Sequence, residues 1–196
     1  QGNAIASSHA PKPWLDWVSG RKFTPLKSVP VNTVRSKQQQ IPESPELAAY
    51  AKLVYEFYKE DPYAFERCAM ELARLFMPSI LHWEITRPWR DGGRDALGTY
   101  RIGHGAGAID VDFAMEAKCY GMNNGVGIKP LSRLISRLRH RQFGILVTTS
   151  YLDTQAYQEL VQDAHPVVVI SSGDIAAKLK ERFGSLDNVK IWLQRI

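Results

Sequence analysis

The sequence contains few cysteines and no long apolar run. Its two cysteines, Cys68 and Cys119, are too few to form a zinc cluster by themselves and provide no disulfide framework. The longest apolar runs, such as 166–170, are far shorter than a membrane span, and no basic-then-apolar secretory signal opens the chain. These absences predict a reduced, cytoplasmic protein that does not cross a membrane.

Acidic residues are absent from one long stretch, 118–141, which contains six lysines and arginines. The preceding stretch, 46–117, is net acidic. An acidic module followed by a basic block suits a carboxylate site beside a surface that binds a polyanion. A solvated basic helix explains the charge equally well, and charge alone leaves both interpretations open.

Proline and glutamine set the first 45 residues apart from the rest of the chain. Six of the eleven prolines lie there, together with a glutamine run at 38–40. This composition predicts a linker or arm. Trp14 and Trp17 are unusual for a linker, so the segment either docks on the core or is the tail of a preceding domain. The remaining residues, 46–196, are enough for one well-packed core.

Hydrophobic periodicity predicts alternating strands and helices in this core. Two helices come first (46–60 and 62–76), and strands follow at 81–86, 96–102 and 111–119. The rest of the pattern is a helix at 129–140, a strand at 143–147, a helix at 154–162, a strand at 167–170 and a helix at 174–183. Strand–helix–strand units at this spacing favour parallel crossovers and an α/β sandwich.

The strand at 111–119 carries the residues best suited to chemistry. Its odd-numbered residues are apolar, whereas Glu116 and Lys118 share the other face, roughly 6–7 Å apart along the strand. Asp95 follows a Gly-Gly turn, and a hairpin would bring it beside Glu116. Clustered carboxylates can hold Mg²⁺, and a nearby lysine can orient water for phosphodiester hydrolysis. A Glu-x-Lys pair is common by chance, however, and an exposed charge pair is the simpler explanation of that motif alone.

Several motifs occur in one order over residues 64–179. They are Phe65-Glu66, Asp91-Gly92-Gly93-Arg94-Asp95, Met115-Glu116-Ala117-Lys118-Cys119-Tyr120, Gly144-Ile145-Leu146-Val147-Thr148-Thr149, Ala156 and Ser172-Gly173-Asp174-Ile175. In this set and order they resemble the Mrr-type branch of the PD-(D/E)xK nucleases, the cleavage domains of restriction endonucleases. The resemblance implies a three-layer sandwich with a mixed central sheet flanked by helices.

The resemblance also implies roles for individual residues. Asp95 and Glu116 would ligate Mg²⁺, and Lys118 would position the water that attacks the phosphate. The family's Gly-Gly-x-Asp turn favours Asp95 over Asp91, and Glu66 matches a helical acid that supports the metal site in some relatives. Many members carry glutamine where this chain has Glu116, and glutamate is an accepted variant.

Basic residues follow the strand on the predicted helix. Arg133, Arg137 and Arg141 recur every four residues and would line one helical face with Lys129 nearby, if the helix continues that far. We expect them to contact DNA phosphates, with a solvated or subunit-facing helix as the alternative. Asp110 and Asp112 share the parity of Glu116, but their position predicts a role at the end of the hairpin.

Taken with the resemblance, these patterns predict a Mg²⁺-dependent restriction-type endonuclease that acts on double-stranded DNA as a homodimer. Two alternatives remain open: a catalytically inactive nuclease fold that binds DNA, and a nuclease of repair or junction resolution. If residues 1–45 are the tail of a DNA-recognition domain, sequence specificity lies outside this chain.

Overall fold

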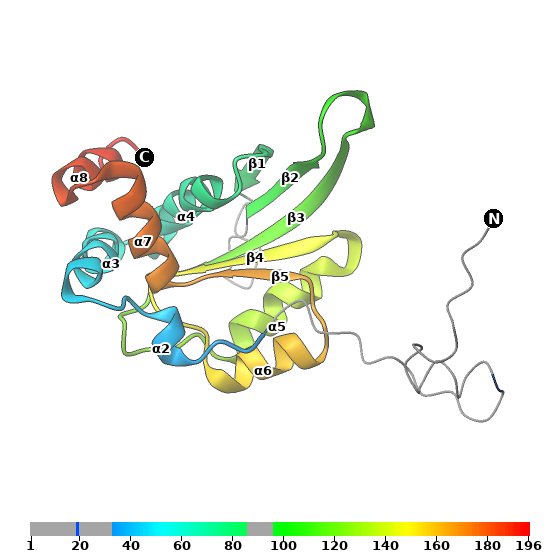
Figure 1. Cartoon of the computed structure of the whole chain (residues 1–196), viewed down its shortest axis with the longest axis horizontal. Coiled ribbons are helices and arrows are strands. Elements are labelled where there is room, and N and C mark those ends of the chain that lie inside the picture. The colour runs from blue at the N-terminus through cyan, green and yellow to red at the C-terminus, as the bar shows by residue number, and fades with distance from the viewer. Residues whose placement is uncertain (1–18, 20–32, 86–95) are drawn as a thin grey trace. The chain divides into compact units, whose positions relative to one another are not determined.

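The computed structural model describes residues 19, 33–85 and 96–196. The chain divides into two units, 1–31 and 32–196, and the second contains the α/β core (Figure 1). Asp91 and Asp95 lie outside the described residues. In the described part of the chain, no helix combines the length and the apolar character needed to cross a membrane.

A mixed sheet forms the centre of the second unit, and its described strands number five, in the order β1-β2-β3-β4-β5. The strands β1 (Ile80–Ile85), β2 (Ala96–Ile102) and β3 (Ile109–Lys118) pair antiparallel. The strands β4 (Phe143–Thr148) and β5 (Val167–Ile170) continue the sheet parallel to β3. Each strand lies within a few residues of its predicted range, and the predicted fold class is confirmed.

One face of the sheet is covered by helices from both ends of the described chain. They are α3 (Pro45–Tyr58), α4 (Pro62–Phe76), α7 (Ser172–Phe183) and α8 (Leu186–Leu193). Phe113 and Met115 of β3 belong to the same buried cluster as Phe65 and Met70 of α4. The odd-numbered residues of β3 therefore face the larger core, as the alternation predicted.

The other face is covered by two crossover helices, α5 (Ile128–Arg137) and α6 (Thr154–Gln162) (Figure 1). Ala114 of β3 is buried together with Leu131 and Leu134 of α5 and Leu160 of α6. The central strands are thus buried on both faces, which is typical of a three-layer α/β sandwich.

The first helices begin where the sequence provides caps. The side chains of Ser44 and Asp61 each accept a hydrogen bond from a backbone N–H in the first turn of α3 and α4. Pro45 and Pro62 follow as the first helical residues, where the missing N–H of proline costs no hydrogen bond. These caps fix the start of α4, the helix that carries Glu66.

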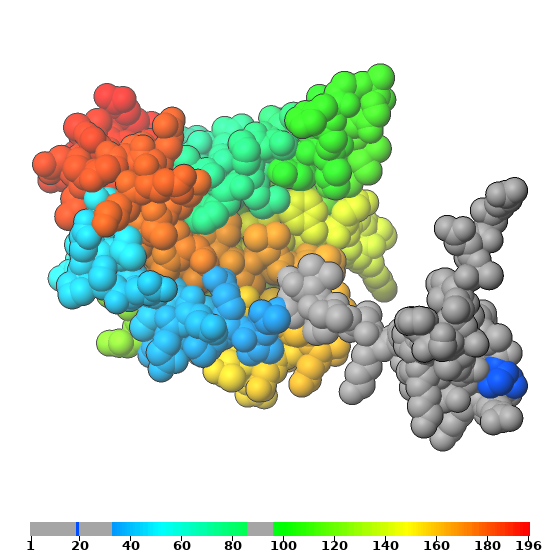
Figure 2. Space-filling model, viewed as in Figure 1, coloured from blue at the N-terminus to red at the C-terminus, as the bar shows by residue number. Residues whose placement is uncertain are grey.

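Residues 35–41, which we name the N-terminal strap, pack on the α/β core although composition places them in a linker-like stretch. The strap contains the short helix α2 (Lys37–Gln40), and Gln40 is fully buried. The Gln40 amide donates to the backbone oxygen of Leu152 at 3.1 Å and accepts from its N–H at 2.9 Å. Figure 2 shows the blue surface of this region against the orange surface of α7 and the yellow surface of α6.

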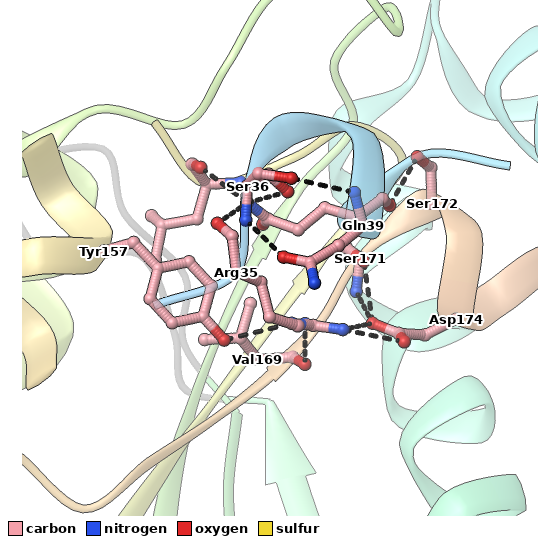
Figure 3. A network of polar contacts seen from close by, with 10 residues as sticks. Arg35, Ser36, Gln39, Tyr157, Val169, Ser171, Ser172 and Asp174 are labelled. Atoms are coloured by element: carbon pink, nitrogen blue, oxygen red, sulfur yellow. Dashed lines mark hydrogen bonds and ion pairs between the residues drawn. The ribbon is translucent and has the colours of Figure 1, made fainter. Parts of the chain in front are cut away.

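Arg35 anchors the start of the strap through all three of its guanidinium nitrogens (Figure 3). It donates to both carboxylate oxygens of Asp174 at 2.9 Å, to the Tyr157 hydroxyl at 3.1 Å and to the Val169 carbonyl at 2.9 Å. Asp174 also accepts from Ser171 and so completes the capping box of α7. The strap thereby joins α6, β5 and α7 through one polar network.

The close approach of the strap to α7 depends on Gly173. A Cβ atom at this position would lie 2.9 Å from the carbonyl oxygens of both Gln40 and Ile41. We expect Gly173→Ala to lower the free energy of unfolding by about 1–3 kcal/mol, because backbone atoms must move apart. Gly107→Ala is the matched control, since a Cβ atom there would meet no other part of the protein within 4 Å. Urea denaturation of both variants tests this, and equal midpoints would show that the strap is not tightly packed.

Candidate active site

Glu116 and Lys118 lie close to the carboxyl end of β3, on the side of the sheet that faces α5. Glu116 is 1% exposed, and its Oε1 lies 2.5 Å from the Nζ of Lys118. Lys118 also donates to the carbonyl oxygen of Ala117 at 3.1 Å. Two residues of equal parity on one strand therefore form a buried ion pair whose lysine remains partly accessible, with its side chain 20% exposed.

The helix α5 brings two arginines to the same carboxylate. Arg137 Nη1 donates to Glu116 Oε2 at 3.0 Å, and Arg133 Nη1 lies 3.8 Å from Oε1. Their side chains are 26% and 35% exposed, whereas that of Glu116 is 2% exposed. The two arginines therefore lie at the boundary between a buried anion and solvent. They are one helical turn apart on α5, as the sequence predicted.

A pocket of about 460 Å³ opens beside this ion-pair cluster. It is bounded by the first turns of α4 and α5 and by the end of β3. Its lining contains Glu66, Lys118, Lys129 and Arg133, together with Pro62, Tyr63, Ala117, Cys119, Tyr120 and Pro130. Four of the residues singled out in the sequence thus surround one pocket, and Glu116 adjoins it through Lys118 and Arg133.

The described lining of the pocket is suited to an anion. Among those residues, Lys118, Lys129 and Arg133 carry positive charges and Glu66 a negative one. The amino-terminal ends of α4 and α5 both border it, and helix amino termini attract anions such as phosphate. The arrangement suits a phosphate group next to carboxylates.

Asp95, the second predicted metal ligand, lies outside the described residues. Its chain neighbour Ala96 pairs with Met115, the residue before Glu116. Among residues 33–85 and 96–196, no three acidic, histidine or cysteine side chains group as a metal site. The described oxygen atoms near the pocket include the carboxylates of Glu66 and Glu116 and the Ala117 carbonyl, which are ligand types that Mg²⁺ prefers.

Arg141 does not share the helical face of Arg133 and Arg137. The helix α5 ends at Arg137, where the prediction extended it to residue 140, and residues 138–140 form a tighter 3₁₀ turn. This turn redirects the chain into β4. Arg141 is extended and donates to the Arg137 carbonyl at 2.8 Å, and it lines a separate pocket with His82 and Glu84.

The acids at the far end of β3 have other partners. Asp110 accepts from Arg101 on β2 at 2.8 and 3.0 Å, and these hydrogen bonds lower the pKa of its carboxyl group. Asp112 accepts from the Thr99 hydroxyl at 3.2 Å. Both contacts lie across the β2–β3 hairpin, in agreement with the hairpin-end role expected from their position.

The thiol in the pocket is poorly suited to act as a nucleophile. Burial raises the pKa of Cys119 to about 11 and that of Cys68 to about 12. Both thiols therefore remain protonated at neutral pH, and the thiolate is the reactive form. The carboxylates and lysines of the pocket remain the candidates for its chemistry.

Sequence reasoning did not single out Tyr63 of the pocket, and it named Tyr120 only as the last residue of the matched motif. Tyr63 lies in the first turn of α4, and Tyr120 is the second residue after the end of β3. It also missed the Arg35–Asp174–Tyr157 network. A tyrosine two residues after the lysine of the Glu-x-Lys motif was a usable signal for the pocket, whereas nothing local to Arg35 indicates its distant partners.

The family model for the Mrr catalytic domain, described as a restriction endonuclease, matches residues 57–179. The chain belongs to this family. The comparison with curated proteins found no match. The match covers α4, the whole sheet and both crossover helices, and it contains every residue of the pocket described above.

Two solved structures resemble the chain over nearly its whole length. One, described as the DNA modification-dependent restriction endonuclease AspBHI, is 48% identical, covers 97% of this chain and has a TM-score of 0.79. The other, the MspJI restriction endonuclease in complex with a 27-mer oligonucleotide, is 28% identical, covers 100% of this chain and has a TM-score of 0.68. This chain spans 49% and 47% of the lengths of those two proteins.

Proposed function

We propose that this chain is the DNA-cleavage domain of a Mg²⁺-dependent restriction endonuclease. The observation that supports it most is the pocket in which Lys118, Lys129 and Arg133 adjoin the carboxylates of Glu66 and Glu116. A phosphodiester needs positive charge around its oxygens, and a divalent metal ion needs carboxylates. The pocket offers both within one family-matched segment.

Asp95 and Glu116 are the metal ligands in this proposal, with Glu66 in support. Pairing of Ala96 with Met115 favours this set, because Asp95 precedes Ala96 in the chain and Glu116 follows Met115. When bound, a divalent ion would supply Lewis-acid stabilisation of the charge that develops on the phosphate. Glu116 and the Ala117 carbonyl provide oxygen donors for it beside the pocket.

Lys118 is the residue proposed to handle the attacking water. Its ammonium group is partly exposed and is fixed by two acceptors, Glu116 Oε1 and the Ala117 carbonyl. It can therefore orient a water molecule toward a phosphate in the pocket. Lys129 and Arg133 would hold the non-bridging oxygens of that phosphate, and Arg137 and Arg141 would add positive charge along the DNA.

Double-stranded DNA is the proposed substrate, and a double-strand break requires two such sites, so we expect a homodimer on DNA. The description of AspBHI as modification-dependent suggests the same requirement here, with the longer protein supplying recognition. The alternative of an inactive DNA-binding fold is weakened because both Glu116 and Lys118 are present and in contact.

Plasmid cleavage tests the proposal. For the full polypeptide that this chain's gene encodes, we expect cleavage of cytosine-methylated DNA with Mg²⁺ and no cleavage with EDTA. Unmethylated plasmid is the matched substrate control. DNA binding without cleavage by the full polypeptide in Mg²⁺ would contradict the proposal and favour the inactive-fold alternative.

A further inference from the structure

Arg137 contacts Glu116 in a way that bears on when the metal site can form. We propose that Arg137 is a positioning residue whose guanidinium group pairs with the Glu116 carboxylate in the DNA-free protein. When DNA binds, the guanidinium group turns to a DNA phosphate instead, and the carboxylate becomes available to the metal. This inference rests on the proposed function, because it assigns Glu116 to the metal and Arg137 to the DNA side of the pocket.

The contact between the two residues is asymmetric. Glu116 is 1% exposed and lies on a central strand of the sheet, so it has little freedom to move. Arg137 lies in the last turn of α5, its side chain is 26% exposed, and its Nη1 donates to Glu116 Oε2 at 3.0 Å. A guanidinium group at a buried–solvent boundary can turn toward a phosphate, whereas the carboxylate cannot leave.

The charges around Glu116 favour the exchange when DNA binds. Among the described ion pairs, the Glu116 carboxylate faces three cations, Lys118, Arg133 and Arg137, so a divalent ion would compete with them for its oxygens. These cations attract DNA phosphates. Phosphates that draw Arg137 and Arg133 away would free Glu116 Oε2 and lower the local positive charge. Metal and DNA should therefore each strengthen the binding of the other.

A purely structural role for Arg137 is the competing explanation. A cation in the last turn of a helix interacts favourably with the helix dipole, and that would explain its position without any link to metal. Arg139, which lies in the following 3₁₀ turn and is exposed, supplies the matched comparison. Among the described ion pairs, those of Glu116 include Arg137 and do not include Arg139.

The test compares Arg137→Gln with Arg139→Gln in the full polypeptide. Mg²⁺ binding to the DNA-free protein is measured by titration calorimetry. The affinity for a fluorescent cytosine-methylated duplex is measured by anisotropy in EDTA and in Ca²⁺, which also takes oxygen ligands. For the wild type we expect Ca²⁺ to strengthen DNA binding about 5-fold or more.

Arg137→Gln is expected to bind Mg²⁺ about 3- to 10-fold more tightly without DNA and to lose most of the Ca²⁺ effect on DNA affinity. Arg139→Gln should weaken DNA binding without changing either quantity. Equal Mg²⁺ affinity in the wild type and Arg137→Gln would overturn the inference. If Arg137→Gln does not fold, Arg137→Met, which also removes the positive charge, should change Mg²⁺ affinity in the same direction, and an unchanged value overturns the inference there. Absence of plasmid cleavage by the wild type would instead count against the proposed function.

Discussion

Replacing Lys118 with alanine is expected to lower the rate of DNA cleavage about 100- to 10,000-fold while DNA affinity changes little. The side chain lies 2.5 Å from Glu116 and lines the pocket, and it is the only lysine that contacts Glu116 among the described ion pairs. A residue that positions or deprotonates the attacking water contributes an effect of this size. Single-turnover cleavage with Mg²⁺ and anisotropy with Ca²⁺ separate the rate from the affinity.

Lys129→Ala is the matched control for Lys118→Ala, because Lys129 lines the same pocket from α5. As a phosphate contact it should mainly weaken DNA binding and reduce the salt dependence by roughly one unit of slope. Its single-turnover rate at saturating DNA should stay within about 10-fold of the wild type. Equal loss of rate in the two variants would show that general positive charge, not the position of Lys118, determines catalysis.

The fold could be predicted largely from local patterns. Alternation along β3 indicated which side of the sheet each residue faces, and the structure places Phe113 and Met115 in the larger core accordingly. Strand–helix–strand spacing likewise predicted the parallel crossovers to β4 and β5. These features follow from periodicity within single elements, which a sequence displays directly.

The partners of the basic helix could not be predicted in the same way. A four-residue spacing shows that Arg133 and Arg137 share a face, but it does not show what that face meets. The crossover between β3 and β4 places α5 over β3, so these arginines contact Glu116 while their side chains remain partly exposed to solvent. The end of α5 was also beyond the pattern, because the 3₁₀ turn that follows depends on the entry into β4.

The N-terminal strap illustrates a second limit. Prolines and a glutamine run gave residues 1–45 a linker-like composition, yet Gln40 is buried and Arg35 is bonded to partners more than 120 residues away. A polar residue satisfied by distant polar groups leaves no periodic signal. Composition predicts solvation on average and cannot identify the single side chains that dock.

Phe113→Ala is expected to lower the free energy of unfolding by about 3–5 kcal/mol. Phe113 is fully buried, and its ring lies 5.5 Å from that of Phe143. The ring also covers Gly98 on the paired strand, since a Cβ there would lie 2.4 Å from Phe113 Cζ. Removal of the ring therefore leaves a cavity over Gly98, which has no side chain that could fill it. The total free energy of unfolding of a domain is only about 5–15 kcal/mol, so this loss is a large share of it.

Phe57→Ala provides the control, because Phe57 is 41% exposed on α3. This substitution should lower the free energy of unfolding by less than about 1 kcal/mol. Urea denaturation measures both variants. Phe113 and Glu116 face opposite sides of β3, so the fraction of Phe113→Ala that remains folded at low temperature should keep its Mg²⁺ affinity. A variant that is stable but no longer binds Mg²⁺ would mean that the larger core positions Glu116 directly, and that the two faces of the strand are not independent.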